Sequence, residues 1–413
     1  MTKSNFKIAV VANSFFGIGG AENSTQSLVR SLTKDGYSVT VFLPDKERSK
    51  QPEKPDFNIR YFPNETLFIS FRDIILNRDQ KINLCADLID FRAIHFCMLN
   101  TMMALFPYFR HRNWSVTCRG GDIQNPRKTN YKEIVRNSPY RIAYKGFRTK
   151  VKNEVFLRIF LLWYRKSGHF ITISEDMLSE LKALGVPTNK AHKILNGVDT
   201  VRLDKILSST YIAKRSEKTK YIYAIGRNDS RKGFYTLLDA AMVLRDRSID
   251  NIRFLLKGRG FNDIVRISEE LNVERYFTVI DENHNIDFKV ETFLEDDGQI
   301  PDVPTVALYK IADIVIIPSL IEALSNIGLE SEVADKPLIV SDTFGCREYI
   351  TRETAIGFRT ADATDLVDQI ISVLSDQNIQ DRLRRMRQIR QKQNNKDNFV
   401  QKYKEIILGK NSV

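Results

Sequence analysis

The chain carries at residues 221–245 the stretch YIYAIGRNDSRKGFYTLLDAAMVLR, and this stretch decides the fold class. Its first part, Tyr221 to Ile225, is a short apolar run typical of a buried strand, and Phe234 to Arg245 has the apolar spacing of a helix. Glycines and charged residues separate the two. A strand, a loop and a helix in this order form the repeating unit of a parallel sheet covered by helices.

The same alternation extends in both directions from this stretch. In the second half we predict strands at Ile252–Lys257, Phe277–Ile280, Asp313–Ile317 and Leu338–Ser341, and a helix at Asn262–Leu271. In the first half we predict strands at Phe6–Ala12, Ser38–Leu43, Ala93–Cys97, Ser115–Cys118 and His169–Ile173, and a helix at Ala21–Lys34. The sequence therefore predicts an α/β protein with two Rossmann-like, doubly wound domains. Ligands of such sheets bind beyond the carboxyl ends of the strands.

The length of 413 residues exceeds what one hydrophobic core serves, which also favours two domains. We predict an N-terminal domain over residues 1–200 and a C-terminal domain over 201–388. A C-terminal helix over 389–413 carries an apolar stripe that can dock back on the N-terminal domain. The acidic segment Asp281–Pro304 has no helical period and reads as a loop or insertion.

The charge balance favours anionic partners, since 63 basic residues face 51 acidic ones and the net charge is +12. No RNA- or DNA-binding motif accompanies this charge, so we expect no nucleic-acid partner. The four cysteines form no CxxC pair and the five histidines no zinc-type cluster, so we expect no metal site and reduced thiols, as in a cytosolic protein. No apolar run approaches the ~20 residues of a membrane span.

The loop Gly226–Gly233 follows a strand, precedes a helix and holds three cations. An arginine such as Arg227 can clamp phosphate with its planar fork, and Lys232 can place a point charge on a leaving oxygen. An exposed basic turn is the alternative interpretation.

Glu322 and Glu330 follow the strand Asp313–Ile317 and lie eight residues apart. In one continuous helix they would be ~12 Å apart along the axis. Two carboxylates with this spacing can hold two parts of one elongated polar ligand, whereas a solvated helix face would also carry them.

Two glycine motifs follow strands of the first half. Gly19 and Gly20 open a helix, whose free N–H groups suit an anion, although such a pair is often only a tight turn. Arg119 and Asp122 flank the second pair, Gly120 and Gly121, and could face a cleft.

In this order the motifs resemble those of the GT-B glycosyltransferases, in particular the retaining family 4. The matching pieces are Gly19-Gly20-Ala21-Glu22, Ile173-Ser174-Glu175, Asn196-Gly197-Val198-Asp199, the loop Gly226–Gly233 and the EX7E segment Pro318–Glu330. The resemblance covers nearly the whole chain. It implies two Rossmann-like domains facing a central cleft, with the acceptor bound by the N-terminal domain and a nucleotide-sugar by the C-terminal domain.

The resemblance also implies roles for individual residues. Arg227 and Lys232 would hold the diphosphate, Glu322 the donor sugar and Glu330 the ribose hydroxyls. The backbone around Leu324, Ser325 and Asn326 would approach the phosphates, and Gly19 and Gly20 would lie near the transferred sugar.

Two departures from the family pattern concern the sugar pocket. Arg119 stands where many relatives have histidine. Because a guanidinium only donates hydrogen bonds, Arg119 could instead bind an anionic donor or acceptor. Ala323 and Leu324 replace the glycine and the small or aromatic residue that relatives often carry.

We therefore expect a retaining glycosyltransferase that moves a sugar from a nucleotide-sugar to a glycan or lipid-linked acceptor in cell-surface polysaccharide synthesis. It would need neither metal nor cofactor. A nucleotide-sugar-binding relative without turnover is the alternative. A dinucleotide-dependent oxidoreductase is disfavoured, because Gly17-Ile18-Gly19-Gly20 does not place a third glycine correctly.

The stretch Arg127–Lys166 holds twelve basic and two acidic residues, interleaved with aromatic and aliphatic ones. Such a pattern predicts peripheral contact with anionic lipid on the inner face of the membrane. An ordinary basic surface whose apolar residues face the domain core is the alternative.

Overall fold

The computed structural model describes residues 3–17, 20–51, 55–62, 78–105, 108–111, 113–118, 157–213, 218–229, 231–280, 289–292, 305–393 and 395–409. These residues form two compact units. The first unit contains the described residues up to 118, those over 157–197 and those from 396 onward. The second unit contains the described residues over 198–395.

The first unit is built on a parallel sheet whose described strands have the order β3-β2-β1-β4-β5-β6-β7. The strands are β1 (Lys7–Val11), β2 (Ser38–Pro44), β3 (Asn58–Phe62), β4 (Ala93–Phe96), β5 (Trp114–Cys118), β6 (His169–Thr172) and β7 (Ala191–Lys193). Its helices are α1 (Gly20–Lys34), α3 (Arg78–Leu88), α4 (Leu99–Ala104) and α7 (Glu175–Ala183), with short 3-10 turns η1 (Lys3–Asn5), η2 (Asp45–Lys50) and η4 (Thr188–Lys190). The strand order reverses at β1, which is the switch point of a doubly wound sheet.

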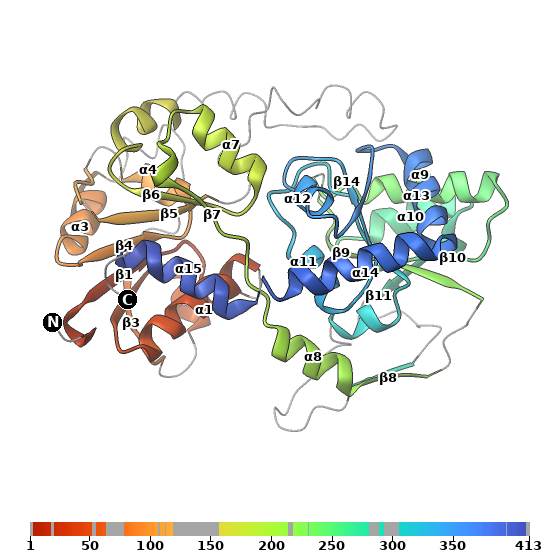
Figure 1. Cartoon of the computed structure of the whole chain (residues 1–413), viewed down its shortest axis with the longest axis horizontal. Coiled ribbons are helices and arrows are strands. Elements are labelled where there is room, and N and C mark those ends of the chain that lie inside the picture. The colour runs from red at the N-terminus through yellow and green to blue at the C-terminus, as the bar shows by residue number, and fades with distance from the viewer. Residues whose placement is uncertain are drawn as a thin grey trace. The chain divides into compact units, whose positions relative to one another are not determined.

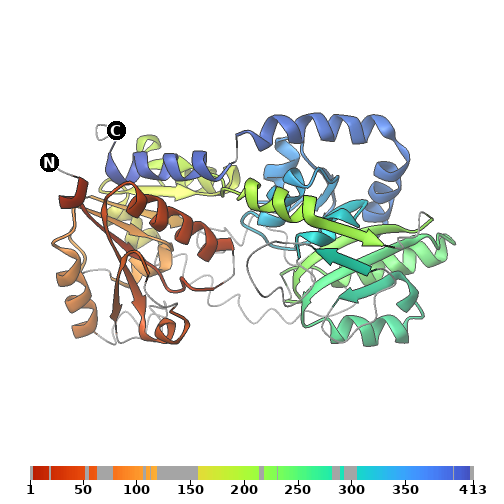
Figure 2. The ribbon, with the colours of Figure 1, turned by 90° about the horizontal axis from the view of Figure 1, so that it is seen from below.

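The last helix, α15 (Lys396–Leu408), belongs to this first unit and runs beside α1 (Figure 1 and Figure 2). Its Phe399, Tyr403 and Ile407 are buried in the same core as β1 and β2. The Tyr403 hydroxyl also lies 3.0 Å from Thr117 Oγ1 on β5. Apolar burial and a buried hydrogen bond together hold the chain end on the first sheet.

The second unit has its own parallel sheet, with the described strands in the order β11-β10-β9-β13-β14-β15. These are β9 (Lys220–Arg227), β10 (Ile252–Arg259), β11 (Phe277–Ile280), β13 (Ile314–Ile317), β14 (Leu338–Ser341) and β15 (Ile356–Phe358). The helices are α8 (Thr200–Ser209), α9 (Tyr235–Asp246), α10 (Asn262–Glu270), α11 (Asn326–Val333), α12 (Arg347–Thr351), α13 (Ala363–Ser375) and α14 (Gln377–Gln391), with 3-10 turns η5 (Glu274–Tyr276) and η6 (Ala307–Lys310). A separate antiparallel pair joins β8 (Thr210–Ala213) and β12 (Lys289–Thr292).

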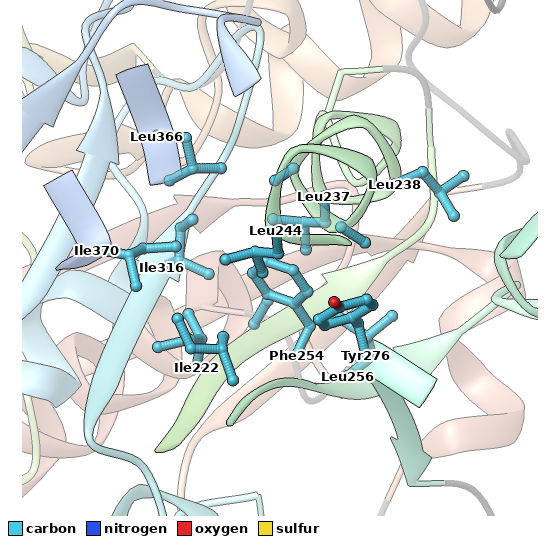
Figure 3. Close-up of a cluster of buried hydrophobic side chains, with 14 of the residues drawn as sticks. Ile222, Leu237, Leu238, Leu244, Phe254, Leu256, Tyr276, Ile316, Leu366 and Ile370 are labelled. Carbon is cyan, nitrogen blue, oxygen red and sulfur yellow. The ribbon is translucent and has the colours of Figure 1, made fainter. Parts of the chain in front are cut away.

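The core of the second unit explains why its central strands are apolar without alternation. Ile222, Phe254 and Ile316, from β9, β10 and β13, meet Leu237 and Leu366 from α9 and α13 (Figure 3). All five side chains are at most 1% exposed. Strands covered by helices bury both faces, so each reads as a continuous apolar run. This packing fixes the carboxyl ends of the strands, where the candidate site lies.

The predicted α/β class with two doubly wound parallel sheets is confirmed. The segment Asp281–Pro304, predicted as a loop or insertion, is in part a strand, because β12 pairs with β8 within it. Five strands were not predicted: β3, β7, β8, β12 and β15. They are three to five residues long, and β3 lies at an edge of the described sheet with only its last residue, Phe62, buried. All four cysteines are free thiols.

Candidate functional site

Two adjacent strands of the second unit, β9 and β10, each carry a glycine one residue before their end, and these glycines let the two backbones approach closely. Gly226 on β9 lies beside Gly258 on β10 in the parallel register. Gly258 has φ +146°, and a Cβ atom there would lie 1.8 Å from the Gly226 carbonyl oxygen. Only glycine fits such an approach. The pair therefore brings the two following residues, Arg227 and Arg259, side by side at the carboxyl edge of the sheet.

Arg227 and Arg259 are both exposed. Within the described part of the chain, neither guanidinium has a hydrogen-bond or ion-pair partner. Two arginines on adjacent strand ends offer planar donors to an anion in the space beyond the sheet. Sequence reasoning singled out Arg227 but missed Arg259. The Gly258-Arg259-Gly260 motif after a predicted strand is the signal that could have found it.

The loop after β9 is joined to the loop after β13 by backbone contacts. Leu320 N donates to the Arg231 carbonyl oxygen over 2.7 Å, and Ile321 N donates to the same oxygen over 3.1 Å. Gly233 has φ +67°, and a Cβ atom there would lie 2.0 Å from the Pro318 carbonyl oxygen. A glycine is therefore required where the two loops cross.

This crossing brings Lys232 and Glu322 together. The Lys232 ammonium donates to Glu322 Oε2 over 2.5 Å, and the side chains are 27% and 14% exposed. Glu322 Oε1 also accepts from the Ala323 backbone N–H over 3.2 Å. The carboxylate is thus held in place, and the ammonium stands partly open to solvent beside it. A polar ligand with an anionic and a hydroxyl-bearing part can meet both groups.

Asp229 stabilises the conformation of the same loop. Its Oδ1 accepts from the Arg231 backbone N–H over 3.0 Å, and its Oδ2 pairs with the Arg231 guanidinium at 3.0 Å. Burial alone would raise the pKa of Asp229, but the hydrogen bonds from Arg231 and the charges of Arg231 and Lys232 outweigh burial and lower it. Of the three cations in this loop, Arg231 therefore stabilises the conformation of the loop through its contacts with Asp229.

Glu322 does not share a helix with Glu330. The helix α11 begins at Asn326, with the extended Ser325 as its N-cap residue, so Glu322 lies in the preceding loop. The spacing that one continuous helix would give therefore does not apply to this pair. The loop that holds Glu322 packs closely against Gly345, which has φ +82°. A Cβ atom on Gly345 would lie 2.1 Å from the Ala323 carbonyl oxygen, so a glycine is needed at this position.

Leu324, Ser325 and Asn326 form the entrance to α11. Leu324 and Ser325 are buried, and the Ser325 carbonyl oxygen accepts a hydrogen bond from the Tyr349 hydroxyl. Gly328 packs so closely on the Tyr349 ring that a Cβ atom would lie 2.3 Å from it. These contacts fix the N-terminus of α11, and the positive end of a helix dipole suits an anion.

The carboxylate of Glu330 has a buried tyrosine as its partner. The Tyr309 hydroxyl donates to Glu330 Oε2 over 2.9 Å, and the Tyr223 ring meets the Tyr309 ring edge-on at 5.3 Å. Burial raises the pKa of Glu330, and the hydrogen bond from Tyr309 opposes that rise. Sequence reasoning missed Tyr309, which lies 21 residues before Glu330 in η6.

In the first unit, the loop after β1 leads to Gly20, the first residue of α1. The fully buried Glu47 holds this loop, because its Oε2 accepts from the backbone N–H groups of Phe15 and Phe16 over 2.9 and 3.1 Å. Burial alone would raise the pKa of Glu47. The hydrogen bonds from Lys50, Phe15 and Phe16 outweigh burial and lower it.

Three predicted site residues lie outside the described residues: Gly19, Arg119 and Asp122. The same holds for the part of the basic stretch over residues 127–156. Cys118 is a fully buried side chain of β5. The structure thus brings together Arg227, Lys232 and the Glu322 loop within the second unit, each at the carboxyl end of a central strand.

In the ranges that the structure describes, no three side chains among histidine, cysteine, aspartate and glutamate gather as metal ligands. None of the described helices is both long and apolar enough to cross a bilayer.

Two family models match successive parts of the chain. "Glycosyltransferase Family 4" matches residues 18–202, and "Glycosyl transferases group 1" matches residues 211–393. A solved structure, that of Anabaena Alr3699/HepE in complex with UDP-glucose, is similar with a TM-score of 0.62 and 15% identity. That likeness covers 97% of this chain and 98% of the other, and it shows the fold.

Two curated proteins are similar over part of their length. An uncharacterized glycosyltransferase of Methanocaldococcus jannaschii is 27% identical over 46% of this chain and 46% of that protein. The N,N'-diacetylbacillosaminyl-diphospho-undecaprenol alpha-1,3-N-acetylgalactosaminyltransferase of Campylobacter jejuni is 23% identical over 58% of this chain and 63% of that protein. The chain thus matches less than two thirds of either relative.

Two doubly wound parallel sheets, with cations and carboxylates at the strand ends of the second, define an α/β protein of the GT-B class. The chain belongs to the group 1 glycosyltransferases of that class.

Proposed function

We propose that the chain transfers a sugar from a nucleotide-sugar donor to a glycan or lipid-linked acceptor, with retention of the anomeric configuration. The contact between Lys232 and Glu322 carries the proposal, because it joins a phosphate-binding cation to a carboxylate suited to sugar hydroxyls. Two similar proteins support a nucleotide-sugar donor and a lipid-linked acceptor. One solved neighbour holds UDP-glucose, and one curated relative acts on a diphospho-undecaprenol-linked sugar.

The difficult step in such a reaction is the cleavage of the bond between the anomeric carbon and the diphosphate oxygen. Negative charge grows on the leaving phosphate while the sugar becomes cation-like. Fixed cations aimed at that phosphate stabilise the transition state more than the ground state. Lys232 and Arg227 are proposed for this role, with Arg259 beside Arg227 in register.

The second proposed role belongs to the carboxylates. Glu322 would accept hydrogen bonds from the donor sugar, and Glu330 from the ribose hydroxyls, with Tyr309 fixing the Glu330 carboxylate. The backbone at Ser325 and Asn326 would approach the phosphates at the N-terminus of α11. The acceptor attacks from the face that the diphosphate leaves, and the departing phosphate takes the acceptor proton. This route yields retention without an enzymic nucleophile.

We further propose that transfer needs no divalent metal and serves cell-surface polysaccharide synthesis on the cytoplasmic face of the membrane. Two cationic side chains at the leaving phosphate can supply the charge that a metal supplies in other enzymes.

The test is a donor panel of UDP-, GDP-, ADP- and CDP-sugars, each with and without EDTA. We expect one nucleotide class to raise the melting temperature and to be consumed when a lipid-linked or glycan acceptor is added. The anomeric proton coupling of the product, read by NMR, tests retention. Loss of turnover in EDTA that is restored by a divalent cation would overturn metal independence. Donor binding without consumption across an acceptor panel would favour a binding protein without turnover.

A further inference from the structure

A helix over residues 157–164 of the first unit is apolar on both of its sides. Its inner side is fixed in the core: Phe160 is fully buried and stacks on Tyr164 at 5.0 Å. The Tyr164 hydroxyl donates to the Phe109 carbonyl oxygen over 2.6 Å, and its ring meets the buried Trp114 edge-on at 6.0 Å. The helix is therefore held rigidly by one side.

The outer side of the same helix is also apolar. Ile159, Leu162 and Trp163 are 43%, 67% and 70% exposed, and their spacing of three and four residues places them on one face. Among the described residues, seven large hydrophobic side chains are exposed, and three of the seven lie on this helix. A helix that is apolar on two opposite sides is normally covered on both, so this face fits a further apolar medium.

The charged residues of this helix and of the turn after it are all basic. Residues 157–167 contain Arg158, Arg165 and Lys166 and no acidic residue, and Arg158 and Lys166 are exposed. Lys166 lies in the turn that follows the helix, three residues after Trp163. Aliphatic side chains, an exposed indole ring and flanking cations are the combination that favours the interface of an anionic bilayer.

One other exposed apolar side chain of the first unit has acidic neighbours in the sequence. Ile89, at 72% exposed, follows α3 and lies between Asp87 and Asp90 in the sequence. An anionic surface would repel that position. Similar exposure combined with opposite charge makes Ile89 a matched control.

We propose that Ile159, Leu162 and Trp163 insert into the headgroup region of an anionic bilayer, with Arg158 and Lys166 contacting the lipid phosphates. This membrane-binding face is separate from the proposed sugar transfer, because it lies in the first unit and needs no nucleotide. The basic composition of residues 127–166 predicts lipid contact in general, and the structure assigns it to one face of one helix.

The experiment uses the full chain and vesicles that contain about one third phosphatidylglycerol, at ~0.05 M salt. We expect cosedimentation of the protein with these vesicles and much weaker cosedimentation with zwitterionic ones. The double variant Ile159→Glu/Leu162→Glu should bind at least ~10-fold more weakly, because it removes apolar contact and adds charges of the wrong sign. The control Ile89→Glu should bind as the unaltered protein does.

The two tryptophans provide an independent measurement. Trp114 is 1% exposed and reports the core, whereas Trp163 reports the proposed membrane face. Insertion should shift the fluorescence emission to shorter wavelength, and lipids brominated on the acyl chain should quench it. The variant Trp163→Phe should keep most of the vesicle binding and lose the shift, since Trp114 does not change its surroundings.

Three results would overturn the proposal. The protein could fail to bind the anionic vesicles at low salt, or the double variant could bind them as well as the control does. The third result is a dimer, measured by light scattering without vesicles, that the double variant abolishes while no vesicle binding is seen; the face would then join two copies of the chain. Nucleotide binding by the double variant should stay unchanged, so a failure of this proposal and a failure of the proposed function are distinguishable.

Discussion

Lys232 donates a hydrogen bond to Glu322 over 2.5 Å, although the two residues lie 90 positions apart in the chain. The contact exists because Leu320 and Ile321 bind the Arg231 carbonyl oxygen and because Gly233 lets the Pro318 carbonyl oxygen approach. Two loops that follow non-consecutive strands are thereby fixed as one surface. A diphosphate that binds Lys232 would compete with Glu322 for the ammonium, which releases carboxylate oxygens to the sugar.

The first prediction concerns this pair. We expect Lys232→Ala to lower kcat by ~100-fold and Glu322→Gln by ~10-fold or more, because each removes a contact to the reacting donor. The double variant should be little worse than Lys232→Ala, since the two side chains act as a unit. The measurement is nucleotide release at saturating donor. Arg247→Ala, which breaks a 2.5 Å surface pair with Asp368, is the matched control and should leave kcat unchanged. Strictly additive losses would contradict a coupled pair.

The second prediction concerns Glu330 and its tyrosine partner. Burial raises the pKa of Glu330, and the Tyr309 hydroxyl holds the rise in check. Tyr309→Phe should therefore raise this pKa further and weaken nucleotide binding by roughly 3- to 10-fold, mostly on the acid side of neutral pH. Calorimetric titration of the nucleoside diphosphate across pH tests this.

Tyr223→Phe is the control for that series, because its hydroxyl donates to the Thr305 carbonyl oxygen instead. Removing the charge of Glu330 should raise the stability of the folded chain, although it weakens nucleotide binding. A carboxyl whose pKa is raised by folding disfavours the folded state once it is ionised, and this effect is relieved as the pH falls through the folded pKa. Glu330→Gln should therefore raise the melting temperature at neutral pH by roughly 2 °C while lowering nucleotide affinity. A lower melting temperature would show that the ionised carboxylate is not destabilising.

The third prediction concerns the glycine at the loop crossing. Gly233→Ala combines φ +67° with a Cβ atom 2.0 Å from the Pro318 carbonyl oxygen, so it should destabilise the second unit by about 2–4 kcal/mol. Urea denaturation measures this loss. Gly36→Ala is the control. Gly36 has φ +89°, but the atom nearest to an added Cβ is 4.0 Å away, so this variant has the backbone strain without the clash and should lose only ~1 kcal/mol of unfolding free energy. Equal losses in the two variants would mean that the close approach is unimportant.

The fourth prediction concerns acid stability of the first unit. The pKa of Glu47 is lower in the folded chain than its ordinary value of 4.5, so its contribution is present above that value and is lost as the pH falls through the folded pKa. Glu47→Gln should cost about 1–3 kcal/mol of unfolding free energy at neutral pH, because a buried acceptor of backbone N–H groups loses its charge. The difference from the unaltered protein should shrink at pH ~3.

Asp45→Asn is the control for Glu47, since Asp45 pairs with Arg48 on the surface with both side chains at least half exposed. This substitution should leave stability within ~0.5 kcal/mol at either pH. An unchanged gap between Glu47→Gln and the unaltered protein at both pH values would contradict a charged Glu47.

Much of the fold was predictable because its central strands are covered on both faces. The apolar runs of β9, β13 and β14 are short, continuous and bounded by charged residues, glycine or proline, and β14 matches its predicted bounds. The missed strands lack this signal. β3 is half exposed, β7 and β15 have three residues each, and the β8–β12 pair depends on partners some 80 positions apart.

The candidate site was predictable where the residue type itself carries the chemistry. Arg227, Lys232, Glu322 and Glu330 were identified from charge and position after strands. Arg259 and Tyr309 were missed, because their relation to the others depends on which strands and turns become neighbours. A phenol that supports a carboxylate has no local pattern of its own.

By itself, the sequence determined the class of the fold and the kinds of charged group at the strand ends, because apolar periodicity and residue chemistry are local properties. Only the tertiary structure decided that Lys232 meets Glu322, that Glu322 precedes a helix instead of sharing it, and that Tyr309 supports Glu330. It also decided that Ile159, Leu162 and Trp163 face outward. The physical reason is that side-chain contacts and burial depend on the strand order and on the glycines that let separate backbones approach, and both act across long stretches of chain.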